Sequence, residues 1–356
     1  MKKVTIKDIA LKAGVSIGTV DRVIHNRGKV NKDVSKRVTD IMNELGYRKN
    51  ILASTLAFNK RRTIAAILPD PKMDPYWEQP DLGINQGQDA VRDFGIQVKK
   101  HWFNLFDVET FIDASKKAIN EQPDAILLAP IFAKESKKLL KIAQEQKIPI
   151  ILINTHLEDD YPLSYIGQDS YQSGYLGGRL IRFGLKKKAQ VMILNLGERS
   201  KNAKHLLRKE QGFKDFFIKN APKIEVFTAN FIDFDNPKKL KSFLEQKLQE
   251  YPNLTGIYIT TSRAYKVIDA FPKHSKKIKI VGFDLLKQNV DYLIQNKISF
   301  LINQHPVEQG YKGIMGLFKH LVMKEPIEKT QYLPLDIVVI ENYKFYLENK
   351  QPIETI

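Results

Sequence analysis

The sequence predicts an α/β protein, in which an N-terminal all-α helix-turn-helix domain precedes a two-lobed, doubly wound parallel-sheet domain. Three observations predict this fold. Helical periodicity fills the first 47 residues, buried-strand patterns alternate with amphipathic segments from residue 63 onward, and basic charge is concentrated near the N-terminus. We therefore expect a first domain over residues 1–47, a short helix and linker over 48–62, and a larger domain over 63–356.

The basic charge is unevenly distributed along the chain. The 356 residues contain 57 Lys and Arg against 40 Asp and Glu, a net charge of +17. Residues 1–62 contain fifteen Lys and Arg against five Asp and Glu, so this sixth of the chain holds +10 and the rest only +7. Such a basic segment is typical of a module that binds a polyanion, although a solvated basic surface or attraction to acidic lipid would give the same charge.

Composition excludes several functional classes. The chain has no cysteine, which rules out disulfides, thiolate catalysis and cysteine-ligated metal sites. It contains neither an HExxH nor a GxxxxGK[ST] motif, and we predict no catalytic residue, cofactor or metal site. No apolar stretch reaches the ~18 to 20 residues of a membrane span, and the N-terminus lacks the apolar core of a secretory signal. These absences predict a cytoplasmic protein with no membrane partner.

Three short helices are predicted in the first domain. The first opens at Thr5, with Asp8 as its capping-box partner, and stops at Gly14, where a left-handed turn is least costly. The second is capped by Ser16, and the third opens at Asn31 and carries its apolar residues on one face. Because only about three residues join the first two helices, these helices must cross steeply, as in a helix-turn-helix.

In a helix-turn-helix, the N-terminal turn of the second helix contacts base edges in the major groove of double-stranded DNA. That position explains the exposed Ile17 and Gly18, because an aliphatic side chain packs on a thymine methyl group and a glycine lets the backbone approach. Arg22 can form a bidentate pair with guanine, worth roughly 1 to 3 kcal/mol of discrimination. The alternative is a purely structural bundle in which Ile17 packs on a neighbour. Residues at helix starts can hold phosphates without reading sequence, and these are Thr5, Ser16, Thr19 and Asn31.

The stretch VTIKDIALKAGVSIGTVDRVI, followed by ELGYRKN, resembles the DNA-binding domain of the LacI/GalR family of bacterial transcription regulators. The match runs without a gap from Val4 to Asn50, with two departures. Lys49 replaces the usual proline, and Asp21 stands where the family usually has serine. Because a carboxylate repels phosphates, Asp21 must be rotated away, paired with a cation such as Arg22, or accept a hydrogen bond from a cytosine amino group.

Residues 50–57 form a helical pattern that is too short for a stable isolated helix, which needs ~12 to 15 residues. The resemblance implies a hinge helix that orders on operator DNA and pairs with its twin in a homodimer. It implies DNA contacts from Asn50, Ala53 and Leu56, with Leu56 inserted between base steps of the minor groove. The alternative is a flexible linker that ends in the basic residues 60–62.

From residue 63 onward, apolar runs alternate with amphipathic segments such as 107–122 and 238–251. Buried parallel strands joined by helices form a doubly wound sheet, and nearly 300 residues predict two lobes with a cleft between them. The runs read as strands are TIAAILP (63–69), AILLAP (125–130), IPIILIN (148–154), AQVMILNL (189–196), GIYITT (256–261) and IKIVGFD (278–284).

Ligands of open α/β sheets bind at the carboxyl ends of the strands, where this sequence places many polar side chains. Hydrogen-bonding groups together with aromatic rings suit a polyhydroxylated ligand. Paired carboxylates would instead suggest glycoside hydrolysis, but the aspartates are too dispersed to predict a pair. The predicted ligand-binding residues at or near strand ends are Asp70, Tyr76, Trp77, Asn154, Asp169, Ser262, Arg263, Asp284 and Gln304, and His156 follows the same strand as Asn154.

The larger domain resembles the type I periplasmic-binding-protein fold, the effector domain of the same family, through YIGQDSYQSGYLGGRL, LLRKEQGF and IVGFDLL. The resemblance implies that Asn154, Asp284 and Gln304 hydrogen-bond a sugar effector. The family's effector-binding arginine falls on Lys209, and its usual Asn-Asp pair falls on Ser262 and Arg263. An arginine facing the pocket would favour an anionic or phosphorylated ligand, whereas Arg263 could equally lie at the surface or in an interface.

Together these features predict a homodimeric transcriptional regulator, in the family's usual role of repressor, whose affinity for operator DNA is controlled by a sugar or sugar-phosphate effector. Ligand in the cleft would change the angle between the lobes and bias the hinge helices. Two alternatives are an exported or cytoplasmic sugar-binding protein and a sugar-processing enzyme with an accessory DNA-binding domain. The residues do not determine whether the effector releases the protein from DNA or recruits it.

Overall fold

The computed structural model of the chain describes residues 4–24, 28, 30–45, 47, 61–186, 188–197, 204–272 and 278–348. Its contacts divide the chain into a first unit, residues 1–59, and a second unit, residues 60–356. Each unit has its own hydrophobic core, and the two are described separately below.

The first unit contains three helices, α1 (Ile6–Ala13), α2 (Ile17–Ile24) and α3 (Lys32–Glu44). The capping box predicted for the first helix is confirmed, since the amide of Thr5 donates to the Asp8 carboxylate at 2.8 Å and the Asp8 amide donates to the Thr5 hydroxyl. Gly14 ends α1 with a left-handed φ of +63°, as predicted. The helices share a small core of Ile9, Ala10, Ala13, Val20 and Val38.

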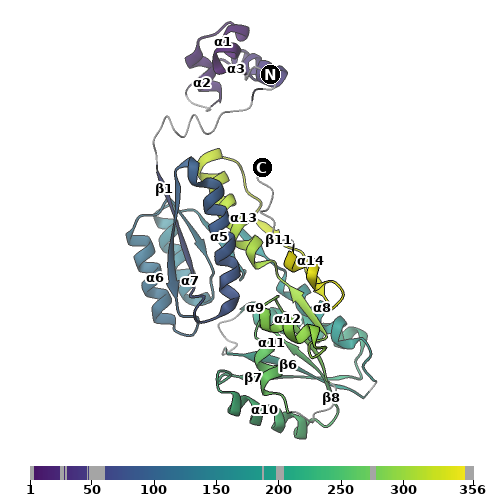
Figure 1. Cartoon of the computed structure of the whole chain (residues 1–356). Helices are drawn as coiled ribbons and strands as arrows, with labels where there is room; N and C mark the ends of the chain where they lie inside the picture. Colours follow the sequence, from purple (N-terminus) through teal and green to yellow (C-terminus); the bar gives the residue numbers. More distant parts are fainter. Residues whose placement is uncertain are drawn as a thin grey trace. The chain divides into compact units, whose positions relative to one another are not determined.

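The second unit has two lobes, each built on a six-stranded sheet, as Figure 1 shows. The strand order of the first sheet is β11-β5-β4-β3-β1-β2, and every pair in it is parallel. Its strands are β1 (Arg62–Pro69), β2 (Ile96–Phe103), β3 (Ala125–Leu128), β4 (Ile150–Ile153), β5 (Ser164–Gly167) and β11 (Thr330–Tyr332).

The second sheet has the order β12-β10-β9-β8-β6-β7 and is parallel except for β12, which runs antiparallel to β10. Its strands are β6 (Gln190–Leu196), β7 (Glu225–Phe231), β8 (Leu254–Ile259), β9 (Lys279–Phe283), β10 (Phe300–Asn303) and β12 (Asp336–Val338). Each of the six apolar runs read as strands overlaps one strand of these two sheets, so the two-lobed, doubly wound prediction is confirmed.

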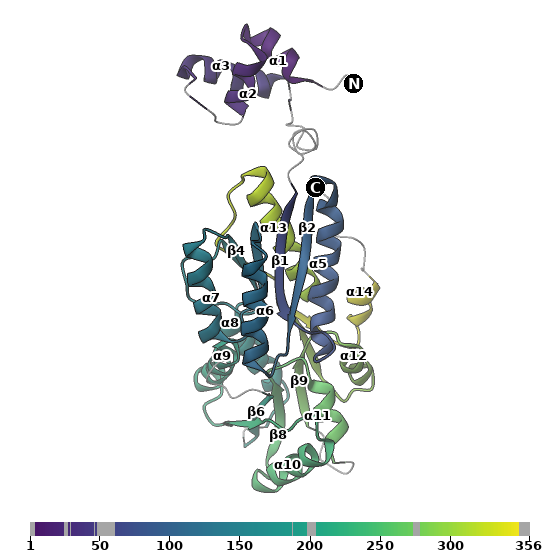
Figure 2. The same cartoon turned by 90° about the vertical axis from the view of Figure 1, so that its left-hand side faces the viewer.

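Helices cover both faces of each sheet, and Figure 2 shows α6 and α7 in front of the first sheet with α13 behind it. In the first lobe, α5 (Glu78–Val91) and α13 (Pro306–Phe318) pack side by side on one face, and α6 (Val108–Asn120) and α7 (Ala133–Glu145) cover the other. The helices of the second lobe are α8 (Ser170–Arg182), α9 (Lys204–Asn220), α10 (Pro237–Glu250), α11 (Ala264–Ala270) and α12 (Lys287–Ile294). Shorter elements are the 3-10 turns Pro75–Trp77 and Arg92–Phe94, the π-helical turn Lys319–Met323 and α14 (Tyr343–Glu348).

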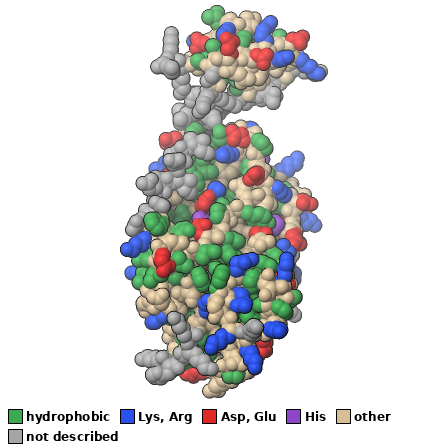
Figure 3. Space-filling view, turned by 90° about the vertical axis from the view of Figure 1, so that its right-hand side faces the viewer, with side chains coloured by type: hydrophobic (Ala, Val, Ile, Leu, Met, Phe, Trp, Pro, Cys, Tyr) green, Lys and Arg blue, Asp and Glu red, His purple; other side chains and the backbone are tan. Residues whose placement is uncertain are grey.

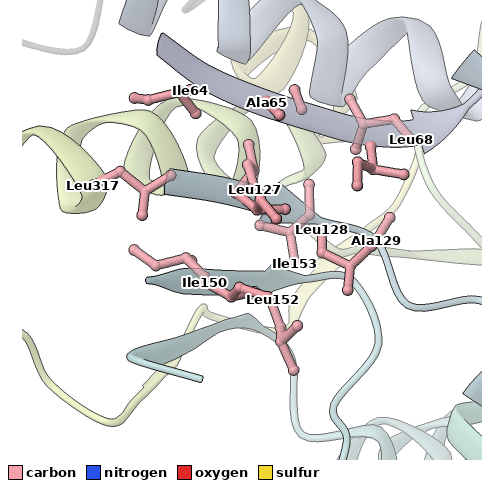
Figure 4. Packing of buried hydrophobic residues seen from close by; sticks show 14 of the residues in the cluster. Ile64, Ala65, Leu68, Leu127, Leu128, Ala129, Ile150, Leu152, Ile153 and Leu317 are labelled. Carbon is pink, nitrogen blue, oxygen red and sulfur yellow. The ribbon is translucent and has the colours of Figure 1, made fainter. Parts of the chain in front are cut away.

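Burial on both faces explains the continuous apolar composition of the central strands. Side chains of β3 and β4, including Leu127, Leu128 and Ile150, pack between the helices, and Leu317 of α13 reaches toward them (Figure 4). In the second lobe, α8 and α9 approach closely at Gly174, where an added Cβ atom would lie 1.8 Å from the Lys209 carbonyl oxygen. This close contact between the backbones of α8 and α9 fixes the position of Lys209 relative to α8.

The chain passes between the lobes three times, from β5 to α8, from β10 to α13 and from β11 to β12. Each lobe is therefore assembled from distant parts of the sequence, and the carboxyl ends of strands from both sheets face the same cleft. Among the described helices, none is long and apolar enough to span a bilayer.

Candidate functional site

One exposed surface of the first unit is formed by the start of α2. Ile17 is 49% exposed although it is a large aliphatic residue, and Gly18 and Arg22 are also exposed. The Ser16 hydroxyl accepts a hydrogen bond from the Thr19 amide at 3.1 Å and so caps the helix beneath them. The first two turns of α2 thus expose an aliphatic side chain, a bare backbone and a guanidinium group, which are groups that can read bases in a major groove.

The helix starts around this surface are also solvent-facing. Thr5 and Asn31 are exposed, and the Asn31 side-chain oxygen accepts from the Asp33 amide at 2.8 Å. Asn50, Ala53 and Leu56, the predicted hinge residues, lie outside the described residues.

Asp21 is half-buried, and its charge acts on Tyr47. Burial, and then the neighbouring Asp21 carboxylate, raise the pKa of the Tyr47 hydroxyl above its usual value.

A cavity lies between the two lobes of the second unit, with about 550 Å³ of empty space including the part open to solvent. Both lobes contribute to its wall, from the segment after β1 and the ends of β4, β8, β9 and β10. Eight residues predicted from sequence line it, namely Tyr76, Trp77, Asn154, Lys209, Ser262, Arg263, Asp284 and Gln304. The other lining residues are Asp74, Leu105, Ile131, Ser170, His205, Leu206, Thr260 and Thr261.

Asn154 and Asp284 occupy equivalent places in the two lobes, directly after β4 and β9. Both have a left-handed backbone, with φ of +67° and +64°, which is uncommon for residues other than glycine. The turn aims each side chain into the cavity from its own lobe, where the Asn154 amide donates to the Tyr76 hydroxyl at 2.7 Å. Such backbone strain persists only where the surrounding structure enforces it, and it concentrates at functional sites.

Asp284 is fully buried and belongs to a polar network that also contains Gln304 and Lys209. The Gln304 amide donates to Oδ2 of Asp284 at 2.5 Å, and the Lys209 ammonium donates to Oε1 of Gln304 at 3.3 Å. Oδ1 of Asp284 accepts no hydrogen bond from any described residue. Burial, only partly offset by Lys209 and Gln304, raises the pKa of the Asp284 carboxyl to about 7. A buried acceptor without a partner inside a cavity is a point where a ligand hydroxyl can donate.

Arg263 lies inside the protein and is 5% exposed. Its guanidinium group forms an ion pair with the equally buried Asp74 at 2.5 Å and donates to the Leu196 carbonyl oxygen at 3.3 Å. The ring of Phe234 lies 4.9 Å from the guanidinium carbon. Because Asp74 compensates its charge, Arg263 no longer gives a reason to expect an anionic ligand.

Two of the ten predicted residues lie elsewhere. Asp70 accepts a hydrogen bond from the Lys72 amide within the turn after β1 and does not line this cavity. Asp169 caps α8 by accepting from the Tyr171 and Gln172 amides at 2.9 and 3.1 Å, and it faces a neighbouring cavity instead. His156 also lines that second cavity.

Sequence reasoning missed the cavity residues Asp74 and His205. Asp74 precedes the tyrosine and tryptophan that were singled out, and its position as a cap before Pro75 was the available signal. His205 lies one turn before Lys209 on α9 and therefore shares its face. The Thr155 hydroxyl is 3.3 Å from Nδ1 of His205, and burial lowers the pKa of this imidazole to about 3.

The raised pKa of Asp284 predicts a pH-dependent stability of the second unit. Between the ordinary carboxyl pKa of about 4 and the folded value of about 7, the folded state retains a proton that the unfolded state releases. Stability should therefore fall as pH rises through this window, by at most about 1.4 kcal/mol per pH unit, and level off above it. Urea unfolding at pH 5 to 8, followed by tryptophan fluorescence, should show this slope in the wild type and not in Asp284→Asn. An equal slope in both proteins would contradict the assignment, and Asp89→Asn on the surface serves as the control.

Two protein families match this chain. The family described as periplasmic binding protein domain matches residues 64–325, and bacterial regulatory proteins of the lacI family match residues 5–50. The two matches cover most of the second unit and nearly all described residues of the first.

Two proteins with similar sequences are regulators. The regulator MalR of Streptococcus pneumoniae is 26% identical over 291 residues, covering 79% of this chain and 83% of its own. Catabolite control protein A of Staphylococcus aureus is 28% identical over 342 residues, covering 93% and 96%.

Solved structures show the same two-lobed fold. A structure from Bacteroides fragilis described as a LacI transcriptional regulator has a TM-score of 0.74 and 27% identity, and covers 81% of this chain and 100% of its own. An ABC-transporter solute-binding protein from Agrobacterium vitis, bound with alpha-D-tagatopyranose, has a TM-score of 0.68 and 26% identity, and covers 79% and 96%.

Proposed function

This chain is a LacI-family DNA-binding transcriptional regulator with a periplasmic-binding-protein domain, and from that premise we propose that a sugar bound between its lobes controls repression of an operator. The observation that carries the proposal is the network around Asp284, a residue that lines the cavity and whose buried Oδ1 has no hydrogen-bond partner among the described residues. A sugar hydroxyl is a neutral donor that would complete this network.

The remaining cavity wall also suits a sugar. The ring of Trp77 and that of Tyr76 meet edge to face with centroids 5.1 Å apart, and both line the cavity. Aromatic faces cover the C–H surface of a sugar ring, while Asn154 and Gln304 offer amide donors and acceptors to its hydroxyls. The Arg263 guanidinium group, which would have favoured a sugar phosphate, is already paired with Asp74, and this pairing favours an uncharged sugar.

On the DNA side, we propose that α2 enters the major groove with Ile17 against a thymine methyl group and Gly18 at the point of closest backbone approach. Thr5, Ser16, Thr19 and Asn31 would fix the register through phosphate contacts. The family resemblance adds DNA contacts from Asn50, Ala53 and Leu56 to this part of the proposal, with Leu56 inserted between base steps of the minor groove.

Arg22→Ala is expected to weaken binding to the operator by about 1 to 3 kcal/mol and to relax specificity at one base pair, because the guanidinium group is assigned to a guanine. The measurement is fluorescence anisotropy of the operator and of its single-base variants at fixed salt. Arg37→Ala, at an exposed position of α3, is the matched control. It should alter the affinity for DNA without changing the base preference. A uniform loss across all sequences for Arg22→Ala would reassign Arg22 to a phosphate.

We propose that the regulator acts as a homodimer that reads a pseudo-palindrome. Hydrophobic side chains exposed on the second unit support an interface, including Leu82 on α5 and Ile294 on α12, each 41% exposed, which line one groove with Phe345 of α14. On the face shown in Figure 3, hydrophobic side chains gather in the middle of the second unit between charged ones. Sedimentation velocity of the full chain tests the dimer, and a monomer at micromolar concentration would contradict it.

DNase protection tests the complete proposal. We expect a protected pseudo-palindrome whose protection changes when a sugar from a panel of neutral monosaccharides and oligosaccharides is added. Reciprocity requires operator DNA to change the affinity for that sugar by the same factor. Protection that no sugar alters would leave the DNA-binding role standing and overturn the sugar effector.

A further inference from the structure

A second cavity adjoins the first along the carboxyl edge of the first sheet, with about 990 Å³ of empty space including the part open to solvent. The first cavity lies beside the ends of β1 and β4, and the second beside the ends of β4, β5 and β11. Its wall includes His156, Glu158, Asp169, Arg208, Gln211 and Tyr332.

The two cavities share part of their wall. Ser170 at the start of α8 and His205 on α9 line both of them. Neighbouring residues also divide between the cavities, since Lys209 faces the first and Arg208 the second. The two spaces are therefore adjoining compartments of one interlobe cleft, and His205 lies at their boundary.

The hydrogen bonds around this boundary hold it in place. The Gln168 amide, which lines the second cavity, donates to the side chain of Gln304, which lines the first. The Thr155 hydroxyl is within 3.3 Å of the His205 ring. The residues at the boundary of the two compartments are thus part of the same network that contains Asp284.

The second compartment is polar, and its wall carries one more negative than positive side chain. Glu158 and Asp169 carry negative charge, Arg208 is positive, and burial lowers the pKa of the His156 imidazole, so this ring is neutral at pH 7. An exposed tyrosine ring, Tyr332, stands at its wall and is 57% exposed. A phosphate would meet two carboxylates here, whereas a neutral ring with hydroxyl groups finds donors, acceptors and an aromatic face.

We propose that the second compartment is a subsite for a further sugar residue, so that the effector is a neutral disaccharide or longer oligosaccharide with one residue beside Asp284 and the next beside Tyr332 and Arg208. This inference rests on the proposed sugar effector. It adds to that proposal that the effector has at least two sugar residues and is uncharged.

The test uses the full chain and an array of matched sugars, including glucose, maltose, maltotriose and glucose 6-phosphate and the corresponding galactose, lactose and galactose 6-phosphate. Hits are titrated in solution by the fluorescence of Trp77, which lines the first compartment. We expect the tightest sugar to be a di- or trisaccharide that binds at least about tenfold more tightly than its monosaccharide.

Variants locate the added affinity. Arg208→Ala and Tyr332→Ala are expected to reduce the ratio of oligosaccharide to monosaccharide affinity about tenfold, whereas Arg179→Ala, an exposed arginine of α8 that lines neither compartment, should leave the ratio unchanged. A monosaccharide or a sugar phosphate as the tightest ligand, or an unchanged ratio in both variants, would overturn the subsite and leave the sugar effector standing. Absence of binding by every sugar would overturn the sugar effector itself, and with it this inference.

Discussion

Asp284→Ala is expected to abolish the response of operator binding to effector while leaving the affinity for operator in the absence of effector unchanged. The side chain is fully buried in the cleft, and one of its oxygens accepts no hydrogen bond from any described residue. Loss of a charged acceptor costs roughly 1.5 to 3 kcal/mol per hydrogen bond, so sugar affinity should fall about 100-fold. Titration of Trp77 fluorescence measures the affinity, and operator anisotropy with and without the sugar measures the response.

Asp70→Ala is the matched control, because Asp70 also follows a strand of the first sheet but does not line the cavity. It should keep both the sugar affinity and the response. A full response in Asp284→Ala, or an equal loss in Asp70→Ala, would place the effector somewhere other than this cleft.

Arg263→Ala is expected to destabilise the second unit by about 3 to 5 kcal/mol, because it leaves the buried Asp74 carboxylate without its cation. The substitution also removes the hydrogen bond to the Leu196 carbonyl oxygen and the packing against Phe234. Equilibrium unfolding in urea, followed by tryptophan fluorescence, measures the loss.

The double variant Asp74→Ala, Arg263→Ala should be less destabilised than the sum of the single variants, since it leaves no unpaired buried charge. Arg92→Ala breaks an exposed ion pair with Asp89 and should change stability by no more than about 0.5 kcal/mol. A loss below about 1 kcal/mol for Arg263→Ala would mean that water reaches Asp74 and that the pair is not buried in solution.

The first unit follows from local chemistry, which is why its sequence predicts it well. Thr5, Gly14 and Ser16 mark helix ends through hydrogen bonds to residues within four positions, so no tertiary information is needed. The central strands were equally predictable, because burial on both faces leaves a continuous apolar run such as AILL in β3.

The edge strands were not recognised as strands. β2, with the sequence IQVKKHWF, and β7, with EVFTANF, lie at edges of the two sheets. Both mix polar and apolar residues instead of forming a continuous apolar run. The three-residue strands β11 and β12 are too short to carry a pattern at all.

The residues of the cleft were predictable only in part. The rule that ligands bind at the carboxyl ends of strands selects positions in the sequence, but it does not show which side chains those positions contact in the fold. It picked Asn154 and Asp284, which the structure brings to one cavity from two lobes. It also picked Asp70, whose side chain is used in a local turn. The ion pair between Asp74 and Arg263 joins residues 189 positions apart in sequence, and only the folded chain shows that one neutralises the other.

The last crossing between the lobes places one edge strand of each sheet, β11 and β12, within nine consecutive residues, Thr330 to Val338. A premature stop shortly before Thr330 would therefore strip both sheets at once and expose the backbones of β5 and β10 to other chains. Neither lobe of the second unit can be produced by cutting the gene at a single point, because each lobe is assembled from segments that alternate along the sequence with segments of the other. Nonsense products that end in this stretch should accumulate as aggregates rather than as shortened regulators.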